Sequence, residues 1–306
     1  MKCSKCSDKA VFQNPNLCKK HFIAYFENKV KNTIKKYKLL TKKDKIVVAC
    51  SGGKDSISVL YLVKKFVKDP VAIAIDEGIK GYRSKTLEDL KEFCKQNKIK
   101  LKIYSYEDYF GASLDKMKKL THLIPCTICG TFRRYMLNKY SKEYTKIVTG
   151  HNLDDEAQSI FMNLLKNNLE ISARLGPETG LIKDKRFTPR VKPLYFCTEK
   201  ETIAYSLLMG FPVTYTECPY SSLSHRMFIR DSLNSYENKR PGFKQTLIDG
   251  FIKTLPKLKK HFKTKVTTNS CEECGGVSDN KICMTCKLSK EIKNKSLYKN
   301  KHNLNT

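Results

Sequence analysis

The stretch Ser51-Gly52-Gly53-Lys54-Asp55-Ser56 lies between an apolar run at 46–50 and a segment with apolar residues at 57, 59, 60 and 62. This order is typical of a buried strand, a glycine-rich loop and a helix. Adjacent glycines let the backbone approach a ligand closely, and the helix start adds partial positive charge. The loop therefore suits a pyrophosphate, although it lacks the Walker A spacing. A plain strand–helix turn is the simpler alternative, but it would need one glycine and no acidic residue.

The surrounding chain alternates apolar runs with helical patterns, which predicts an α/β fold with a parallel sheet. The candidate strands are 46–50, 71–75, 101–104 and 146–149, and a helix is predicted over 84–96. Polar groups at 51–56, 76–78 and 150–155 directly follow three of these runs. Because ligands of such folds bind at the carboxyl ends of the strands, we expect these groups to share one site.

The composition favours a polyanionic partner. The 306 residues include 59 Lys+Arg against 30 Asp+Glu, a net charge of +29. Heat adaptation would add glutamate alongside lysine, so nucleic acid is the favoured explanation. No apolar run approaches the roughly 18–20 residues of a membrane span, and the first residues resemble no signal peptide. Thirteen cysteines in a chain expected to be cytoplasmic indicate metal or redox chemistry, and they argue against a disulfide-stapled secreted fold.

Two groups of cysteine and histidine residues have the two-pair spacing of tetrahedral zinc sites. They are Cys3, Cys6, Cys18 and His21 near the N-terminus, and Cys271, Cys274, Cys283 and Cys286 near the C-terminus. Each segment is too short to fold by hydrophobic burial alone, whereas structural zinc contributes about 10–16 kcal/mol of apparent binding free energy. Catalytic zinc is disfavoured because neither group leaves a coordination position open.

These modules frame the central domain. The predicted boundaries are 1–26 for an N-terminal zinc finger, 27–44 for a basic linker helix, 45–240 for the α/β domain, 241–267 for a basic helical segment, 268–290 for a C-terminal zinc finger and 291–306 for a basic flexible tail. The linker helix is expected because Phe26, Val30 and Ile34 recur at helical spacing among lysines. The tail is expected because it is rich in Lys and Asn and has little apolar content.

A further pair, Cys126-x-x-Cys129, has no partner pair nearby in the sequence. Arg133 and Arg134 follow it, and their charges would lower the thiol pKa values and attract phosphate. From the residues alone this pair fits a redox dithiol, a persulfide carrier or part of an iron–sulfur site. The remaining cysteines Cys50, Cys94 and Cys197 are predicted to be small buried hydrophobes.

Acidic residues follow three of the predicted strands. Asp55 could bind Mg²⁺, shape the glycine-rich loop or simply cap a helix. Lys54 could meet phosphate as a point charge. Asp76 is placed to accept a ribose or adenine hydrogen bond, while Asp154 and Asp155 could contact Mg²⁺ and nucleotide or cap a helix.

The glycine-rich loop resembles the PP-loop of N-type ATP pyrophosphatases. With five further stretches, the chain from Cys3 to Cys286 is similar to the TtcA/TtuA family of tRNA thiolases, in its two-zinc-finger branch. Those stretches are Asp-Glu-Gly-Ile at 76–79, Gly-Tyr-Arg at 81–83, Cys-Thr-Ile-Cys-Gly at 126–130 followed by two arginines, Gly-His-Asn-Leu-Asp-Asp-Glu-Ala at 150–157 and Glu-Cys-Pro-Tyr at 217–220.

The resemblance implies a Rossmann-like PP-loop domain that adenylates the C2 oxygen of a tRNA uridine with ATP and Mg²⁺, and then replaces that oxygen with sulfur. It implies catalytic roles for Asp55, Asp154 and Asp155. It also implies nucleotide contacts by Ala49, Ser51, Gly52, Gly53, Lys54, Asp55, Ser56, Ile75, Asp76, Gly150, His151 and Asp155. Cys218 would join Cys126 and Cys129 as the third ligand of a [4Fe–4S] cluster, which leaves one iron without a protein ligand. A cluster-free persulfide route stays open as the alternative.

The resemblance also implies partners. They are tRNA, contacted by Arg133, Arg134, Arg226 and Arg230, a sulfur donor (sulfide or a thiocarboxylated ubiquitin-like protein), and a second copy of the chain. The wobble uridine is the favoured target, because Arg174-Leu175-Gly176-Pro177 resembles the wobble-uridine enzymes, and a T-loop uridine is second. The alternatives are a cytidine thiolase, a lysidine synthetase, or a noncatalytic zinc-finger RNA-binding protein, which would have no use for the glycine-rich loop.

Overall fold

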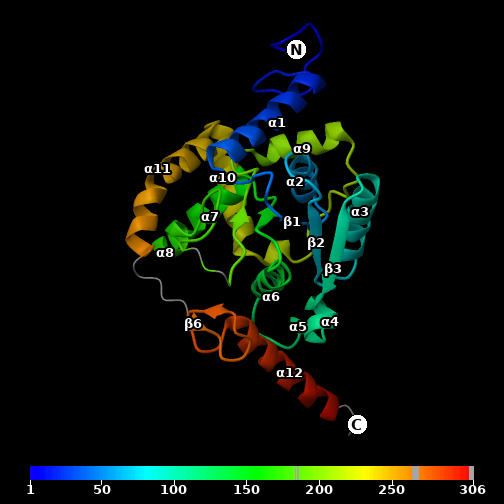
Figure 1. Ribbon diagram of the computed structural model, residues 1–306, viewed down its shortest axis with the longest axis vertical. Coiled ribbons are helices and arrows are strands. Elements are labelled where there is room, and N and C mark those ends of the chain that lie inside the picture. The colour runs from blue at the N-terminus through cyan, green and yellow to red at the C-terminus, as the bar shows by residue number, and fades with distance from the viewer. Residues whose placement is uncertain (183, 185, 264–268, 303–306) are drawn as a thin grey trace.

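A five-stranded parallel sheet forms the centre of the molecule in the computed structural model, which describes residues 1–182, 184, 186–263 and 269–302 (Figure 1). Its strands lie in the order β3 (Lys100–Ser105), β2 (Val71–Asp76), β1 (Ile46–Ala49), β4 (Lys146–Thr149) and β5 (Arg190–Val191). All neighbouring pairs are parallel, so the predicted α/β fold with a parallel sheet is confirmed.

The order of the strands reverses between β1 and β4. From β1 the chain continues to β2 and β3 on one side, and it later returns to β4 and β5 on the other. Ala49 and Thr149 are paired in register at the ends of β1 and β4, so the loops that follow them diverge from adjacent points. Such a switch point is where open α/β sheets bind their ligands.

Helices cover both faces of the sheet because strand residues alternate between two buried clusters. Val48, Ala72 and Val148 face one cluster, while Val47, Ile73 and Ile147 face the other. The first cluster includes residues of α1 (Lys19–Lys36), α2 (Lys54–Lys64), α3 (Arg83–Gln96) and α9 (Glu199–Met209). The second includes residues of α4 (Tyr106–Phe110), α5 (Leu114–Met117), α6 (Pro125–Tyr140) and α12 (Met284–His302).

A third cluster joins helices beyond β4. It contains residues of α7 (Leu153–Leu165), α10 (His225–Lys239) and α11 (Phe243–Lys263), and α8 (Leu169–Ala173) contacts α7 and α11. The remaining elements are the short helix η1 (Ser221–Leu223) and the hairpin strands β6 (Asn269–Ser270) and β7 (Val277–Ser278). The predicted helical segment at 241–267 thus contains α11, and residues 264–267 lie outside the described chain. Predicted buried cysteines Cys50, Cys94 and Cys197 are confirmed, since each is at most 4% exposed.

The predicted linker helix at 27–44 is wrong in its bounds. Helix α1 begins at Lys19, inside the predicted zinc module, and ends at Lys36. It starts early because Phe22 and Phe26 extend its apolar face and are fully buried. Lys38 then adopts a left-handed conformation with a φ of 50°, which a right-handed helix cannot continue through.

The prediction of a flexible tail at 291–306 is also wrong for residues 291–302, which lie in α12. Leu288 and Ile292, four residues apart, are 2% and 3% exposed and belong to the cluster that includes α6. This anchoring orders a helix whose composition would not do so alone. Residues 303–306 lie outside the described chain.

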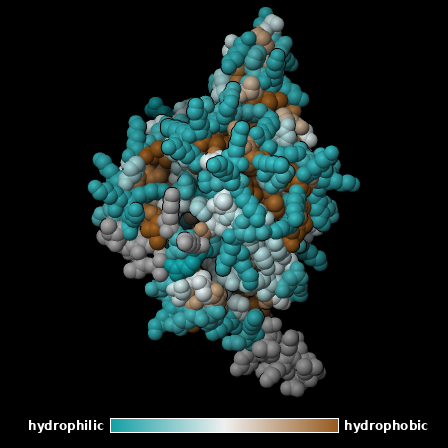
Figure 2. Space-filling view, viewed as in Figure 1, coloured by the Kyte–Doolittle hydropathy of each residue, from teal (hydrophilic) through white to brown (hydrophobic). Residues whose placement is uncertain are grey.

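The two cysteine-rich modules lie toward opposite ends of the longest axis of the molecule, and α12 extends beyond the C-terminal one (Figure 1). The face seen in Figure 2 is covered mostly by hydrophilic side chains. No helix within the described residues is long and apolar enough to cross a bilayer.

Candidate functional site

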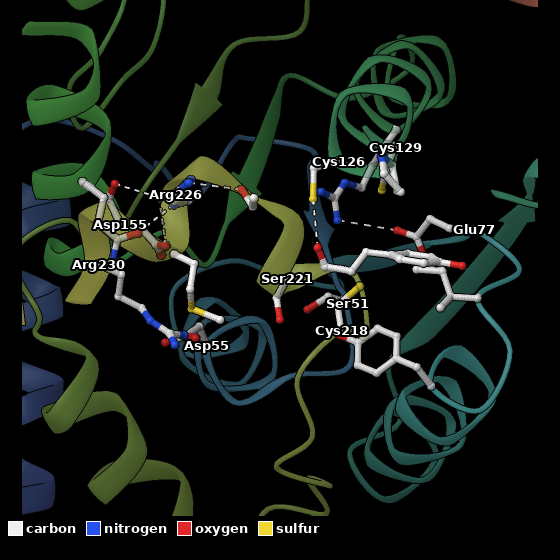
Figure 3. A pocket seen from close by; sticks show the side chains of 18 of the residues that line it. Ser51, Asp55, Glu77, Cys126, Cys129, Asp155, Cys218, Ser221, Arg226 and Arg230 are labelled. Atoms are coloured by element: carbon white, nitrogen blue, oxygen red, sulfur yellow. Dashed lines mark hydrogen bonds and ion pairs between the residues drawn. The ribbon is translucent and has the colours of Figure 1, made fainter. Parts of the chain in front are cut away.

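A cavity of about 340 Å³ opens at the switch point between β1 and β4. Its walls come from the glycine-rich loop, from α6, from α7 and from the segment that leads through η1 into α10. Figure 3 shows Cys126 and Cys129 toward one end of this cavity and Asp155 and Arg226 toward the other. One cavity therefore joins two groups of predicted site residues that lie far apart in the sequence.

The glycine-rich loop is pressed against α3. Gly52 has a φ of +86°, and a Cβ placed on it would lie 1.9 Å from the carbonyl oxygen of Thr86. Only glycine fits there. The hydroxyl of Ser56 accepts the Ser51 N–H at 3.2 Å and donates to the Gly53 carbonyl at 2.9 Å. These bonds hold the loop at the start of α2, whose first N–H groups have no partner within the helix and suit an anion.

Charged side chains surround the loop. Lys54 Nζ lies 3.0 Å from Asp55 Oδ2 and 2.9 Å from Glu199 Oε1. Burial disfavours the charged form of Lys54, but the two carboxylates outweigh it and raise its pKa. Asp55 Oδ1 also accepts a hydrogen bond from the Asn152 amide at 3.1 Å. Burial raises the pKa of Asp55, and Lys54 partly offsets that rise.

The neighbouring aspartates of α7 have different surroundings. Asp154 is 7% exposed and uses both carboxylate oxygens: Oδ1 lies 2.5 Å from Lys244 Nζ, and Oδ2 accepts the Glu199 N–H at 2.7 Å. Asp155 caps α7 by accepting the Asn152 N–H at 3.2 Å, and its Oδ1 lies 3.2 Å from Arg226. Asp154 therefore holds two structural elements together, whereas Asp155 faces the cavity with one arginine partner.

The three predicted cluster cysteines all line the cavity, although the chain separates Cys218 from the other two. Cys126 and Cys129 lie one turn apart on α6, and the Cys126 thiol donates to the Tyr220 carbonyl at 3.5 Å. Burial raises the pKa of Cys129, against the opposing effect of Arg133, and burial also raises that of Cys218. Three half-buried thiols around a shared space fit an iron–sulfur cluster, in which each cysteine binds a different iron.

Sequence reasoning missed several residues that build this site. Glu77 and Arg83 form a buried ion pair at 2.9 Å, and Arg133 lies 3.5 Å from the same carboxylate. Glu77 and Arg83 belong to the stretches 76–79 and 81–83 that carry the family resemblance, and this was the signal that could have identified them. Glu199 and Lys244 had no signal of their own, because only the fold brings them to the loop and to α7.

Most of the arginines that were predicted to contact RNA form hydrogen bonds or ion pairs within the protein. Arg226 and Arg230 line the cavity, and Arg226 donates to Gln158 at 2.7 Å while Arg230 lies 2.9 Å from Glu217. Arg134 is exposed and lies outside the cavity lining.

The remaining predicted nucleotide contacts lie close to the loop. Gly150 packs against it, since a Cβ there would lie 2.8 Å from the Asp55 carbonyl carbon. His151 Nδ1 lies 2.9 Å from the Thr149 hydroxyl. Asp76 accepts the Gly78 N–H at 2.9 Å, and Ile75, just before it, is buried at the end of β2. Ala49 ends β1 directly before the loop.

Two further ligand groups lie outside the cavity. Within the described residues, the ligand atoms of Cys3, Cys6, Cys18 and His21 all lie within 4.8 Å of one another, as do those of Cys271, Cys274, Cys283 and Cys286. The Cys6 and Cys18 sulfurs are 3.7 Å apart, and those of Cys274 and Cys283 are 3.8 Å apart. A tetrahedral zinc with Zn–S bonds of about 2.3 Å separates its sulfurs by about 3.8 Å. The donor sets therefore fit zinc.

Comparisons with known proteins agree with this geometry. Residues 23–236 match the model of the PP-loop domain family. The chain is 39% identical over 301 residues to the tRNA-5-methyluridine(54) 2-sulfurtransferase of Pyrococcus horikoshii, covering 95% of this chain and 96% of that protein. It is 34% identical over 300 residues to the cytoplasmic tRNA 2-thiolation protein 1 of Candida glabrata, covering 92% and 83%.

A solved structure is also similar. The U34-tRNA thiolase NcsA from Methanococcus maripaludis, determined with its [4Fe–4S] cluster, superposes with a TM-score of 0.79 at 30% identity, and the match covers 95% of this chain and 96% of that one. The matched family domain spans more than half of the chain, and these relatives are matched over most of their length. The chain therefore belongs to the PP-loop family and, within it, to the tRNA 2-thiolation proteins.

Proposed function

We propose that the protein is an ATP-dependent tRNA-uridine 2-sulfurtransferase. The observation that carries this proposal is the single cavity that joins the PP-loop to the three cysteines Cys126, Cys129 and Cys218. A nucleotide-binding protein without sulfur chemistry would not need the cysteines, and a noncatalytic RNA-binding protein would not need a loop that only glycine fits at position 52.

The first half of the reaction activates the base. The uridine C2 oxygen attacks the α-phosphorus of ATP, a new O–P bond forms, and pyrophosphate leaves. The N–H groups at the start of α2 and the Lys54 ammonium would bind phosphate oxygens. Lys54 is now held by Asp55 and Glu199, so we expect phosphate to replace one of these carboxylates. Of the carboxylates that line the cavity, Asp55 and Asp155 would hold Mg²⁺, which neutralises charge on the phosphates.

The second half introduces sulfur. A sulfur nucleophile adds to C2, the C2–O bond breaks, and AMP leaves with the oxygen. The cysteines would hold a [4Fe–4S] cluster with one iron free of protein ligands, which can carry the incoming sulfur. Arg133 lies one turn after Cys129, and its positive charge favours anionic sulfur there.

In this proposal the two zinc groups contribute to tRNA binding. Each would hold one structural zinc ion and stabilise a small module at either end of the molecule. Together with the basic helices α1 and α11, they would grip a tRNA through its phosphates, while the target base unstacks into the cavity. We further propose a cytoplasmic location, a homodimer, and sulfide or a thiocarboxylated ubiquitin-like protein as sulfur donor.

Two target uridines have support. The wobble position is favoured by the stretch Arg174-Leu175-Gly176-Pro177 and by the similarity to the U34 thiolase. The T-loop position is the second candidate, because the relative with 39% identity is named for methyluridine 54.

The test is nucleoside mass spectrometry with position mapping. Anaerobically purified, iron-reconstituted protein is incubated with ATP, Mg²⁺, sulfide and unmodified tRNA. New 2-thiouridine at position 34 or 54 supports the chemistry and assigns the target. Thiocytidine, lysidine, or no sulfur incorporation despite a verified cluster and intact ATP binding would overturn the proposal.

A further inference from the structure

Glu77 is a buried carboxylate in the wall of the cavity that joins the PP-loop to the cysteines. It follows β2 directly, next to Asp76, and it is 5% exposed. Its two oxygens have different partners: Oε2 lies 2.9 Å from Arg83 Nε, and Oε1 lies 3.5 Å from Arg133 Nη1. One carboxylate thus binds two arginines, which belong to α3 and to α6. Removal of one partner of a buried ion pair is strongly destabilising, because it leaves an uncompensated buried charge.

Arg83, the first partner of Glu77, contacts the PP-loop. Arg83 is 3% exposed, and its guanidinium donates to the carbonyl of Ser51 and, at 2.8 Å, to that of Ile75. It also donates to the Thr86 hydroxyl at 3.0 Å. Thr86 is the residue whose carbonyl excludes any side chain at position 52. Arg83 therefore connects the PP-loop to the end of β2 and helps to fix the position of the loop.

Arg133, the second partner of Glu77, lies at the end of the cavity that holds the cysteines. Arg133 lies one turn after Cys129 on α6, and both residues line the cavity. Its side chain is 47% exposed, so the chain does not bury it in place. Glu77 is the carboxylate that pairs with it. Figure 3 shows Glu77 at the same end of the cavity as Cys126 and Cys129, with a dashed line that marks an ion pair of its carboxylate.

We propose that Glu77 is a positioning residue that couples uridine activation at the PP-loop to sulfur delivery at the cysteines. This inference rests on the proposed function. Both half-reactions act on one C2 atom, so the two ends of the cavity must keep a fixed separation, and displacements of about 1 Å can slow a reaction about 10²-fold. When sulfur arrives late, water attacks the adenylated C2, the bond from C2 to the AMP oxygen breaks, uridine is regenerated and AMP is released. Glu77 limits this loss because it pairs with both Arg83 and Arg133 and so keeps the two ends of the cavity at a fixed separation.

The test measures coupling. Pyrophosphate release and 2-thiouridine are counted in the same reaction for the wild-type protein and for Glu77→Gln. The carboxamide keeps the shape of the side chain, but it removes the charge that binds two arginines. We expect thiolation to fall by about 10- to 100-fold, while pyrophosphate release and the KM for ATP change much less, so that more pyrophosphate is released per 2-thiouridine. A role confined to folding would lower both products in parallel and leave their ratio at the wild-type value, which would overturn the inference.

Two controls keep the result interpretable. Asp44→Asn also converts a partly buried, lysine-paired carboxylate to an amide. Asp44 lies next to the starts of β1 and β4, at the opposite end of the strands from the cavity. We expect it to leave the ratio unchanged. If Glu77→Gln does not fold, Arg133→Gln cuts the same connection at a half-exposed residue, and an unchanged ratio there refutes the coupling. If wild-type protein forms no 2-thiouridine, the proposed function itself fails, and this inference fails with it.

Discussion

Lys244 Nζ lies 2.5 Å from Asp154 Oδ1, although Lys244 belongs to α11, beyond residue 236 where the family match ends. Lys244 is 7% exposed and also contacts Asn234 of α10. The other oxygen of Asp154 holds the first N–H of α9, and Glu199 of α9 in turn holds Lys54. A helix outside the matched domain is thereby connected to the PP-loop, and Asp154 acts as a link within the protein.

Replacing Lys244 with methionine should therefore affect both stability and the nucleotide site. Removal of one partner leaves Asp154 buried and unpaired, which typically costs about 3–5 kcal/mol of unfolding free energy. We also expect the KM for ATP to rise, because Asp154, which holds the first N–H of α9, loses the lysine that fixes it. Urea unfolding and ATP-dependent pyrophosphate release measure the two effects.

The matched control for this change is Lys116→Met. Lys116 pairs with Glu107 at 2.6 Å, but the two side chains are 65% and 57% exposed. An exposed pair of this kind contributes less than about 1 kcal/mol. If the two variants lose equal stability, the buried pair has no special role.

Gly52→Ala should weaken nucleotide binding through a steric clash. Gly210 has a comparable φ of +66°, but nothing lies within 4 Å of a Cβ placed there. Gly210→Ala should then show only the backbone strain, about 1–2 kcal/mol, and keep its affinity for ATP. Gly52→Ala adds the collision with the Thr86 carbonyl, so we expect ATP affinity to fall by at least about tenfold. Equal ATP affinity in the two variants, measured by calorimetry, would show that the loop tolerates a side chain.

The sequence predicted the parts of this fold whose signals are local. Residues 46–50 and 146–149 are apolar runs that end at polar loops, and the structure places β1 and β4 there. Helix α12 has no such signal, because Leu288 and Ile292 are two apolar positions among lysines and asparagines. Its order comes from packing on a core formed by residues more than a hundred positions earlier.

The same distinction holds for the site. Cysteine spacing and the doubled glycine are read within a few residues, so the ligand groups and the loop could be predicted. Cys218 entered the predicted site only through family resemblance. Lys244 is one of 59 basic residues, and nothing near it in the chain indicates a buried partner 90 residues away.

The two zinc groups should bind one ion each. We expect two zinc ions per chain in the wild-type protein and one in Cys18→Ser or in Cys271→Ser, measured by elemental analysis. Cys94→Ala is the control, since Cys94 is a buried cysteine outside both groups, and it should keep two. Structural zinc contributes about 10–16 kcal/mol of apparent binding free energy, so loss of an ion should unfold its module. Two ions in Cys18→Ser would refute the N-terminal site.

Asp55→Ala should separate catalysis from RNA binding. Asp55 touches Lys54 and Asn152 beside the PP-loop, and it is a proposed Mg²⁺ ligand, so ATP-dependent thiolation should disappear. The affinity for tRNA should persist, because it depends on lysines and arginines spread over the surface, and it should fall steeply with salt in both proteins. Asp249→Ala, which removes an exposed carboxylate on α11, controls for the change in net charge. Undiminished thiolation by Asp55→Ala, with tRNA binding measured on the same preparation, would show that the PP-loop assignment is wrong, whereas loss of both activities would place Asp55 in folding.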